Sequence, residues 1–177
     1  YDKETWVQDS RVNKTVLKTQ HGITPISGVS ATVIMQSNSK LDGFHIDSER
    51  LQYGVYANNC NSITVSNCLI ENSDIPIQLI QSTGEIIGND VTGNEQCLVI
   101  NNSTGQVNII RNRFYSNNLT QKDNIYISNS NNIILKNNLI IGGYNGLAFF
   151  NSTNSHFING IVSFAENFGI LIQESTG

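Results

Sequence analysis

The sequence predicts an all-β protein built as a parallel β-helix, a solenoid with about 22 to 25 residues in each coil. Three observations support this fold. A short motif, ITVSNCLIEN from Ile63 to Asn72, returns as EIIGNDVTGN, NIIRNRFYSN and IILKNNLIIG. The copies follow one another at a nearly fixed period, and a second alternating segment precedes each of them. Because tandem units of this length cannot bury their own apolar side, they must stack.

An Asn near the centre of each copy sets the period. These residues are 22, 23, 25 and 22 positions apart: Asn67, Asn89, Asn112, Asn137 and Asn159. An apolar side chain lies two positions before and two positions after each Asn, which is the period of a strand with the Asn on its buried side. Stacked inward Asn side chains can hydrogen-bond to the copies above and below. We therefore expect an internal Asn ladder at a bend of the chain.

The segment upstream of each Asn is the first strand of the predicted coil. Its copies read GVYAN, PIQLIQ, CLVIN, NIYIS, GLAFF and GILIQ, and small polar turns such as NCNS and STGE follow them. Each period then holds a strand, a polar corner, a second strand with a central Asn, and a return loop of variable length. The first strands are expected to form one continuous sheet, with neighbours about 4.8 Å apart.

Two other repetitive or all-β folds fit the pattern less well. A leucine-rich solenoid requires a Leu-x-x-Leu-x-Leu-x-x-Asn register, and the Leu-x-x-Leu spine is missing from these repeats. A β-sandwich requires varied hairpins and has no fixed period. The parallel β-helix is therefore the predicted fold.

The period divides the chain into two parts. Residues 1–26 lack it and are expected to form an N-terminal lead-in or cap, whereas residues 27–177 are expected to form the β-helix. The sequence starts without an initiator Met and stops after GILIQESTG, just past the first strand of a further coil. We expect it to be a fragment of a longer protein.

Composition narrows the range of partners. The 177 residues carry a net charge of -4, and charged residues make up only 14% of the chain, so no basic stripe is available to bind nucleic acid. No apolar run approaches the roughly 18 residues of a membrane span. The three His residues are scattered without ligand spacing, so we expect no metal site and no cofactor.

Two further groups of side chains are expected to be structural. Cys60, Cys68 and Cys97 form no Cys-x-x-Cys pair, so they are expected to be free thiols that are small and buried. Asp90 and Arg113 follow the Asn position on adjacent coils, and we expect them to form a surface ion pair that contributes under about 1 kcal/mol.

The phrases LDGFHI and GVYANNCNSITVSNCLIENS resemble the right-handed parallel β-helix superfamily, which includes pectate-lyase-like enzymes, phage tailspikes and NosD-like repeats. The resemblance covers residues 27–177, and it is specific for the fold but not for an activity. It implies an extended polysaccharide or cell-surface glycan lying in a groove across the coils. Resemblance to the phage proteins, which often form trimers, also implies a homotrimer. An extracellular or virion-associated location follows from the same resemblance.

The return loops supply the candidate catalytic acids. Asp74, Glu95 and Asp123 precede the first strand in three successive coils, and Glu49 does so one coil earlier. Stacking is expected to place neighbouring acids about 5 Å apart and alternate ones about 10 Å apart. Glycosidases use carboxyl pairs about 5 to 5.5 Å apart for retention, or about 6.5 to 9.5 Å apart for inversion. We therefore predict Asp74, Glu95 and Asp123 as catalytic residues.

The outer face of the first strands supplies the candidate substrate-binding residues. Tyr56 and Tyr126 are expected to stack on sugar rings, and Gln78 and Asn101 to hydrogen-bond sugar hydroxyls. This face lacks the carboxylate cluster, accompanied by Arg or Lys, that binds calcium in pectate-lyase-like enzymes. That departure from the family pattern disfavours calcium-dependent lyase chemistry.

Two functions remain open. The first is a tailspike-like β-helix that binds a surface glycan and acts on it as a glycoside hydrolase or a polysaccharide lyase. The alternative is a non-catalytic structural or adhesive shaft that trimerises through the apolar part of the same face. This part is expected to include Val99, Ala148, Phe150 and Leu171.

Overall fold

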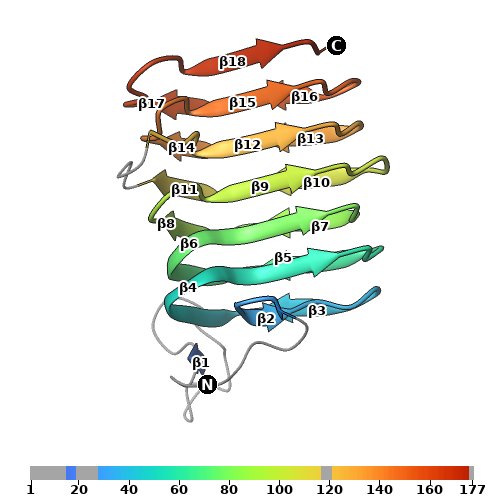
Figure 1. Ribbon diagram of the computed structural model, residues 1–177, viewed down its shortest axis with the longest axis vertical. Helices are drawn as coiled ribbons and strands as arrows, with labels where there is room; N and C mark the ends of the chain where they lie inside the picture. The colour runs from blue at the N-terminus through green and yellow to red at the C-terminus, as the bar shows by residue number, and fades with distance from the viewer. Residues whose placement is uncertain (1–14, 19–27, 117–120, 176–177) are drawn as a thin grey trace.

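The structure is a computed structural model that describes residues 15–18, 28–116 and 121–175. The described residues form short strands joined by turns and contain no α-helix, and their paired strands run parallel. Figure 1 shows the strands stacked in successive coils along one axis. The all-β solenoid that the sequence predicts is therefore confirmed. Of the expected lead-in, residues 1–26, only β1 (Thr15–Lys18) is described.

A six-stranded sheet forms one side of the solenoid, which we call the first face. Its spatial order is β16-β13-β10-β7-β5-β3, so each coil contributes one strand. The strands are β3 (Lys40–Asp42), β5 (Ile63–Ser66), β7 (Gly84–Ile87), β10 (Val107–Ile110), β13 (Ile133–Lys136) and β16 (His156–Ile158).

A twelve-stranded sheet forms the rest of the solenoid. Besides β1, its strands are β2 (Ala31–Ile34), β4 (Phe44–Asn58), β6 (Leu69–Ile80), β8 (Asp90–Gly93), β9 (Leu98–Asn101), β11 (Arg113–Ser116), β12 (Ile125–Ser128), β14 (Leu139–Ile141), β15 (Leu147–Phe150), β17 (Ile161–Ser163) and β18 (Ile170–Gln173).

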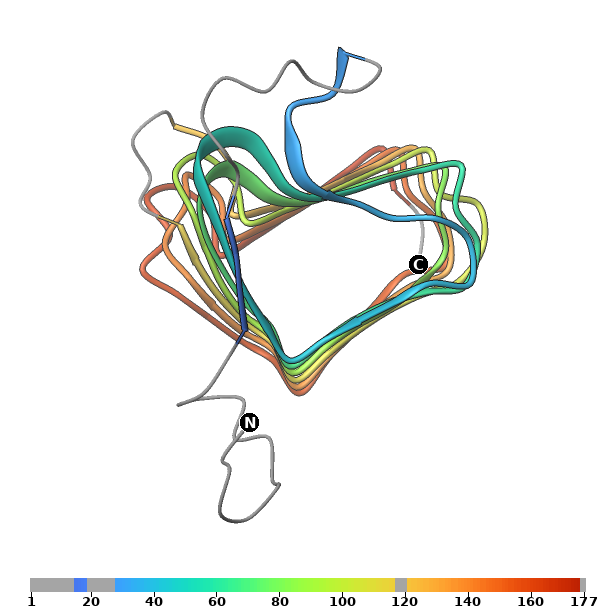
Figure 2. The ribbon, with the colours of Figure 1, turned by 90° about the horizontal axis from the view of Figure 1, so that it is seen from below.

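Bending divides this larger sheet into two further faces. The beginning of β6 pairs with β8, whereas its end pairs with β9. From β8 onward the two parts are separate strands. We call the side with β8, β11, β14 and β17 the second face, and the side with β9, β12, β15 and β18 the third face. Figure 2, a view along the axis, shows the successive coils superimposed around a common interior.

Alternating side chains from all three faces fill this interior. On the second face the inward column is apolar in every paired coil, and its members are Ile46, Ile70, Val91, Phe114, Ile140 and Val162. The first five of these are fully buried. Strand periodicity therefore builds one continuous apolar core, and its burial is the main stabilising contribution to the fold.

The expected sheet of first strands is the third face. Tyr56 pairs with Gln78, Gln78 with Val99, Val99 with Tyr126, and the column continues through Ala148 and Leu171. This register places the predicted residues in one column of the sheet, in which Gln78, Val99 and Ala148 are buried. The expected second strand with a central Asn is instead two strands in different faces, because the chain bends sharply at that point.

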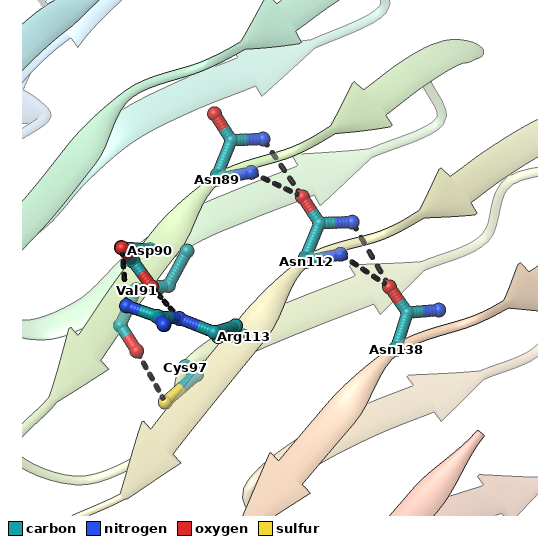
Figure 3. Close-up of polar contacts among 7 residues, drawn as sticks. All are labelled: Asn89, Asp90, Val91, Cys97, Asn112, Arg113 and Asn138. Atoms are coloured by element: carbon teal, nitrogen blue, oxygen red, sulfur yellow. Dashed lines mark hydrogen bonds and ion pairs between the residues drawn. The ribbon is translucent and has the colours of Figure 1, made fainter. Parts of the chain in front are cut away.

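An Asn ladder runs along the bend between the first and second faces (Figure 3). Asn89 and Asn112 are buried in it, as predicted. The ladder continues to Asn138, and it begins at Cys68, whose N–H donates to Asn89 Oδ1 at 2.9 Å. The predicted ladder is therefore confirmed, but two of its members differ from the expected residues.

Asn67, Asn137 and Asn159 are not in the ladder, and this part of the predicted register is wrong. Each lies at the preceding position of the bend, where its side chain is exposed. The backbone φ angles there are 52°, 57° and 49°. Asn tolerates this left-handed conformation better than most residues because its short polar side chain bonds locally. Two adjacent positions of one bend therefore both favour Asn, for different reasons.

A second ladder, of Ser residues, lines the corner between the third and first faces. Each Ser, buried in all but the half-buried Ser175, accepts the main-chain N–H of its counterpart one coil earlier: Cys60 N to Ser82 Oγ, Ser82 N to Ser103 Oγ, Ser103 N to Ser130 Oγ, Ser130 N to Ser152 Oγ and Ser152 N to Ser175 Oγ, at 2.9 to 3.3 Å. The hydroxyls thus satisfy N–H groups that turn inward at the corner. The sequence analysis did not identify this ladder.

Candidate functional site

The predicted acids lie where the chain passes from the second face to the third. Asp74 lies at the bend inside β6, and Glu95 lies in the loop between β8 and β9. Both side chains are half-buried. The N–H groups of Glu95 and Gln96 each donate to Asp74 O at 3.1 Å, so the two acids stand on backbone segments that touch. The structure therefore brings Asp74 and Glu95 together.

Asp123 is offset from this pair by one residue. Leu98 pairs with Ile125, and Cys97 N donates to Asn124 O at 2.8 Å, which places Asp123 level with Gln96 and not with Glu95. The return loop before β12 is longer than the one before β9, and length differences of this kind shift the register of the acids. The three acids follow one another along the coils, but they do not form a single column.

Asn145 holds the Asp123 carboxylate in place from the next coil. Its main-chain N–H and its side-chain Nδ2 both donate to Asp123 Oδ1, at 3.3 and 2.6 Å. Burial nevertheless raises the pKa of the Asp123 carboxyl, and the Asn145 hydrogen bonds and the charge of Lys122 oppose this shift only in part. The carboxyl is thus both oriented and biased toward its protonated form.

Asp123 and Tyr126 share one pocket of about 300 Å³. We call this cavity the Asp123–Tyr126 pocket; its lining also includes Gln96, Gln121 and Lys122. Tyr126 packs against Phe150 of the next coil, with ring centroids 5.3 Å apart. The pocket therefore joins an acid and an aromatic ring that the sequence analysis proposed separately, and it adds Gln96 and Lys122, which that analysis missed although both adjoin predicted acids.

The remaining predicted binding residues are more dispersed. Tyr56 is in the same outward column as Tyr126 but three coils away, or about 14 Å at the usual strand spacing. It contacts the ring of Tyr53 instead, at a centroid distance of 5.1 Å. It also lines a separate hollow of about 360 Å³ with Asn58 and Met35. The two Tyr side chains thus belong to different cavities.

The two predicted amides already have protein partners. Gln78 is only 3% exposed, and its Nε2 points to Leu79 O and Val99 O at 3.3 and 3.4 Å. The half-buried Asn101 accepts a hydrogen bond from Ser128 Oγ at 2.8 Å. In this arrangement Gln78 offers almost no surface to a ligand, whereas Asn101 keeps part of its amide accessible.

Charged side chains on the second face form pairs. Arg113 and Asp90 make the ion pair predicted from the sequence, with two guanidinium–carboxylate contacts, of which Nη2 to Oδ2 is 2.7 Å (Figure 3). His45 Nε2 lies 2.8 Å from Glu71 Oε1, and Lys18 Nζ lies 3.1 Å from Asp47 Oδ2. These contacts connect neighbouring strands across the outer surface.

No group of three or more His, Cys, Asp and Glu side chains in the described ranges is arranged to hold a metal ion. Within the same residues, no helix is long and apolar enough to cross a membrane.

A family model described as a right-handed β-helix region matches residues 26–177. The match spans the coils of all three faces. No curated protein and no solved structure matches the chain. Members of one fold can carry unrelated activities, so the arrangement of side chains must indicate the function.

Proposed function

The chain belongs to the right-handed β-helix family, and we propose that it binds a surface polysaccharide in the Asp123–Tyr126 pocket. One observation carries the proposal: an aromatic ring, a half-buried acid, a Lys and two Gln side chains line the same cavity. Ligand sites in proteins combine apolar surface with a few convergent polar groups in this way. A polysaccharide or cell-surface glycan is the substrate class we propose.

Each lining residue has a distinct role in this proposal. Tyr126 presents a ring to the apolar face of a sugar, and Phe150 supports that ring from the next coil. The amides of Gln96 and Gln121 can both donate and accept, which suits hydroxyl groups. Asn101 lies one coil before Tyr126 on the same face and extends the polar surface beyond the pocket.

Hydrolysis of the bound glycan is the reaction that these acids would perform. We assign Asp123 as the general acid, because a raised pKa keeps the proton that must pass to the leaving glycosidic oxygen. Glu95, one coil earlier, is the carboxylate that would take a proton from the attacking water. Asp74, in main-chain contact with Glu95, completes the predicted acidic group.

The experiment is a glycan-array assay, followed by a reducing-sugar assay on each polysaccharide that binds. Tyr126→Ala is expected to weaken binding by up to about tenfold, because a stacked ring contributes about 0.5 to 1.5 kcal/mol. Tyr115→Ala, on the outer surface of the second face, is the matched control and is expected to bind normally. Asp123→Asn is expected to bind but to release no reducing sugar.

Two results would overturn this proposal. If the protein binds no glycan of the array, the recognition function is wrong. If Asp123→Asn and Glu95→Gln release sugar at the normal rate, these acids have no catalytic role; if the original protein binds a glycan but releases no sugar, the domain is a recognition module. A product with unsaturated sugar ends would assign the reaction to a lyase instead of a hydrolase.

The second candidate is a non-catalytic shaft that trimerises through the third face. The apolar contact between Tyr126 and Phe150 favours it, because these rings lie on the outer side of that sheet. However, Val99 and Ala148 are already buried within a single chain, so they offer little area to a partner. Sedimentation equilibrium distinguishes the candidates, since a strict monomer excludes the trimeric shaft.

A further inference from the structure

A hollow of about 590 Å³ lies on the first face, away from the Asp123–Tyr126 pocket. It spans three successive coils, from β5 across β7 to β10, and contains none of the residues predicted as a site. Its lining includes Ile63, Thr64, Gly84, Glu85, Gln106 and Asn108. Its volume is within the range typical of small-molecule sites.

Unequal corner lengths open this hollow. In the coil of β5, three positions separate the Ser-ladder residue Cys60 from Ile63, the first residue of the strand column. In the next coil only two positions separate Ser82 from Gly84, and in the following coil four separate Ser103 from Val107. Because the short corner of the β7 coil lies between two longer corners, the surface at that coil is recessed. The projecting corner between β9 and β10 is visible in Figure 1.

Two glycines lie at this corner, where neighbouring coils approach closely. Gly84 has a φ of +145°, and a Cβ added to it would lie 2.1 Å from Ile63 O. A Cβ on Gly105 would lie 2.6 Å from Thr83 Cγ2. The Gly84 contact is with the main chain and cannot be relieved unless the main chain moves, so Gly is required there, whereas the Gly105 contact is with a side-chain methyl group that must shift to make room.

Successive hydrogen bonds connect the polar side chains that line the hollow. Gln106 Nε2 donates to Asn108 Oδ1 at 2.9 Å, and Asn108 Nδ2 points to Glu85 Oε1 at 3.5 Å. Thr64, Glu85 and Asn108 occupy one outward column on neighbouring strands. This column therefore displays hydroxyl, carboxylate and amide groups at the regular spacing of the coils, about 4.8 Å.

The chemistry of this lining points to a neutral, hydroxyl-rich ligand. No Lys or Arg lines the hollow, which disfavours an anion such as phosphate, and Glu85 is its single carboxylate. The one large apolar side chain, Ile63, is buried, which disfavours an apolar peptide. Amides and hydroxyls that both donate and accept match sugar hydroxyls. We propose that this hollow is a second binding site, which holds an uncharged oligosaccharide segment across three coils.

The test is an NMR titration of the whole isotope-labelled chain with cellohexaose, maltohexaose and mannohexaose. At least one of these sugars is expected to shift the amide signals of Thr64, Glu85 and Asn108. Thr64→Tyr fills the hollow from β5 and is expected to weaken that binding on the order of tenfold. Thr92→Tyr, outward on the second face, is the matched control and is expected to leave it unchanged. The amide spectrum of each variant reports whether it has folded.

The proposal is independent of the Asp123–Tyr126 pocket, and the same titration separates the two. Shifts confined to Lys122, Asp123 and Tyr126 would support the proposed function and overturn the second site. Shifts on the first face that Tyr126→Ala leaves intact would support the second site even if the first fails. If none of the three sugars moves the first-face signals, or if Thr64→Tyr binds as tightly as the original protein, the second site is wrong.

Discussion

Asn112 Oδ1 accepts two hydrogen bonds from Asn89, one from its main-chain N–H and one from its side-chain Nδ2, each 2.9 Å long. Asn138 Oδ1 accepts the same pair from Asn112, at 2.9 and 3.1 Å (Figure 3). Asn112 Nδ2 also donates to Ile86 O at 2.8 Å. One side chain thus satisfies two main-chain groups of the preceding coil, Asn89 N–H and Ile86 O, and this explains why Asn is needed at the bend.

We expect Asn112→Ala to lower the free energy of unfolding by about 3 kcal/mol. The substitution leaves the N–H groups of Asn89 without an acceptor inside the protein, and each unsatisfied buried group costs about 1 to 3 kcal/mol. Urea unfolding followed by circular dichroism measures the change. The control is Asn137→Gly, which keeps the positive φ and alters only an exposed side chain, so it is expected to change stability little. Equal losses in both variants would contradict the ladder register.

This register is also where the sequence prediction was partly wrong. The motif correctly identified a buried Asn at a bend, but Asn67 and Asn137 are exposed and the ladder positions are Cys68 and Asn138. A left-handed backbone position and an inward ladder position adjoin one another, and both favour Asn. Spacing along the chain alone cannot separate them, because only the stacked coils show which side chain is level with its neighbours.

The Ser ladder gives the second prediction. Ser130 Oγ accepts Ser103 N at 3.1 Å and donates to Ser128 O at 2.8 Å. We expect Ser130→Ala to destabilise the protein by about 1 to 2 kcal/mol, because a buried N–H loses its acceptor. Ser37→Ala is the control: its hydroxyl accepts Asn61 N at 3.0 Å, but the side chain is exposed and water can replace it. The measurement is again urea unfolding, and an effect no larger than that of the control would show that this ladder is dispensable.

The sequence contained a signal for the Ser ladder that the analysis did not use. A Ser recurs two positions after the first strand of each coil that follows the one with Cys60, within STG, NSN or NST, but these letters were interpreted as generic turn residues. Turns and inward corners both favour Ser, so composition could not distinguish them. The sequence was likewise insufficient to place every residue of the candidate site. Return loops were correctly placed before the third face, but the level of Asp123 depended on loop length, which no period specifies.

The Asp90–Arg113 ion pair is expected to contribute less than about 1 kcal/mol, because both side chains are substantially exposed, at 38% and 57%. A double-mutant cycle with Asp90→Asn and Arg113→Gln measures the coupling between them. We expect the coupling to weaken further in high salt, since exposed charges are screened. A coupling well above 1 kcal/mol that is insensitive to salt would indicate that the pair is part of a buried network instead.

The buried thiols are expected to be unreactive in the folded protein. Burial raises the pKa of the Cys97 thiol to about 12, and Cys60 and Cys68 are buried as well. Because the thiolate is the nucleophile, iodoacetamide should modify none of the three at neutral pH until urea unfolds the chain. Mass spectrometry of the alkylated protein checks this. Rapid modification of Cys97 under native conditions would show that the third face opens locally.

The contributions of Asp123 and Asp42 to the free energy of unfolding are expected to change with pH in opposite directions. Burial raises the pKa of Asp123, so the folded chain holds this proton to a higher pH than the unfolded chain does, and the free energy of unfolding falls as pH rises through that window. Hydrogen bonds from Asn67 and Ser66 lower the pKa of Asp42, so its contribution is present above the ordinary value near 3.8 and is lost as pH falls through the lowered one. Relative to the original protein, Asp123→Asn should therefore gain stability from acid to neutral pH, whereas Asp42→Asn should lose it. Urea unfolding at a series of pH values measures both, and two profiles of the same sign would contradict the environment assigned to one of these carboxyl groups.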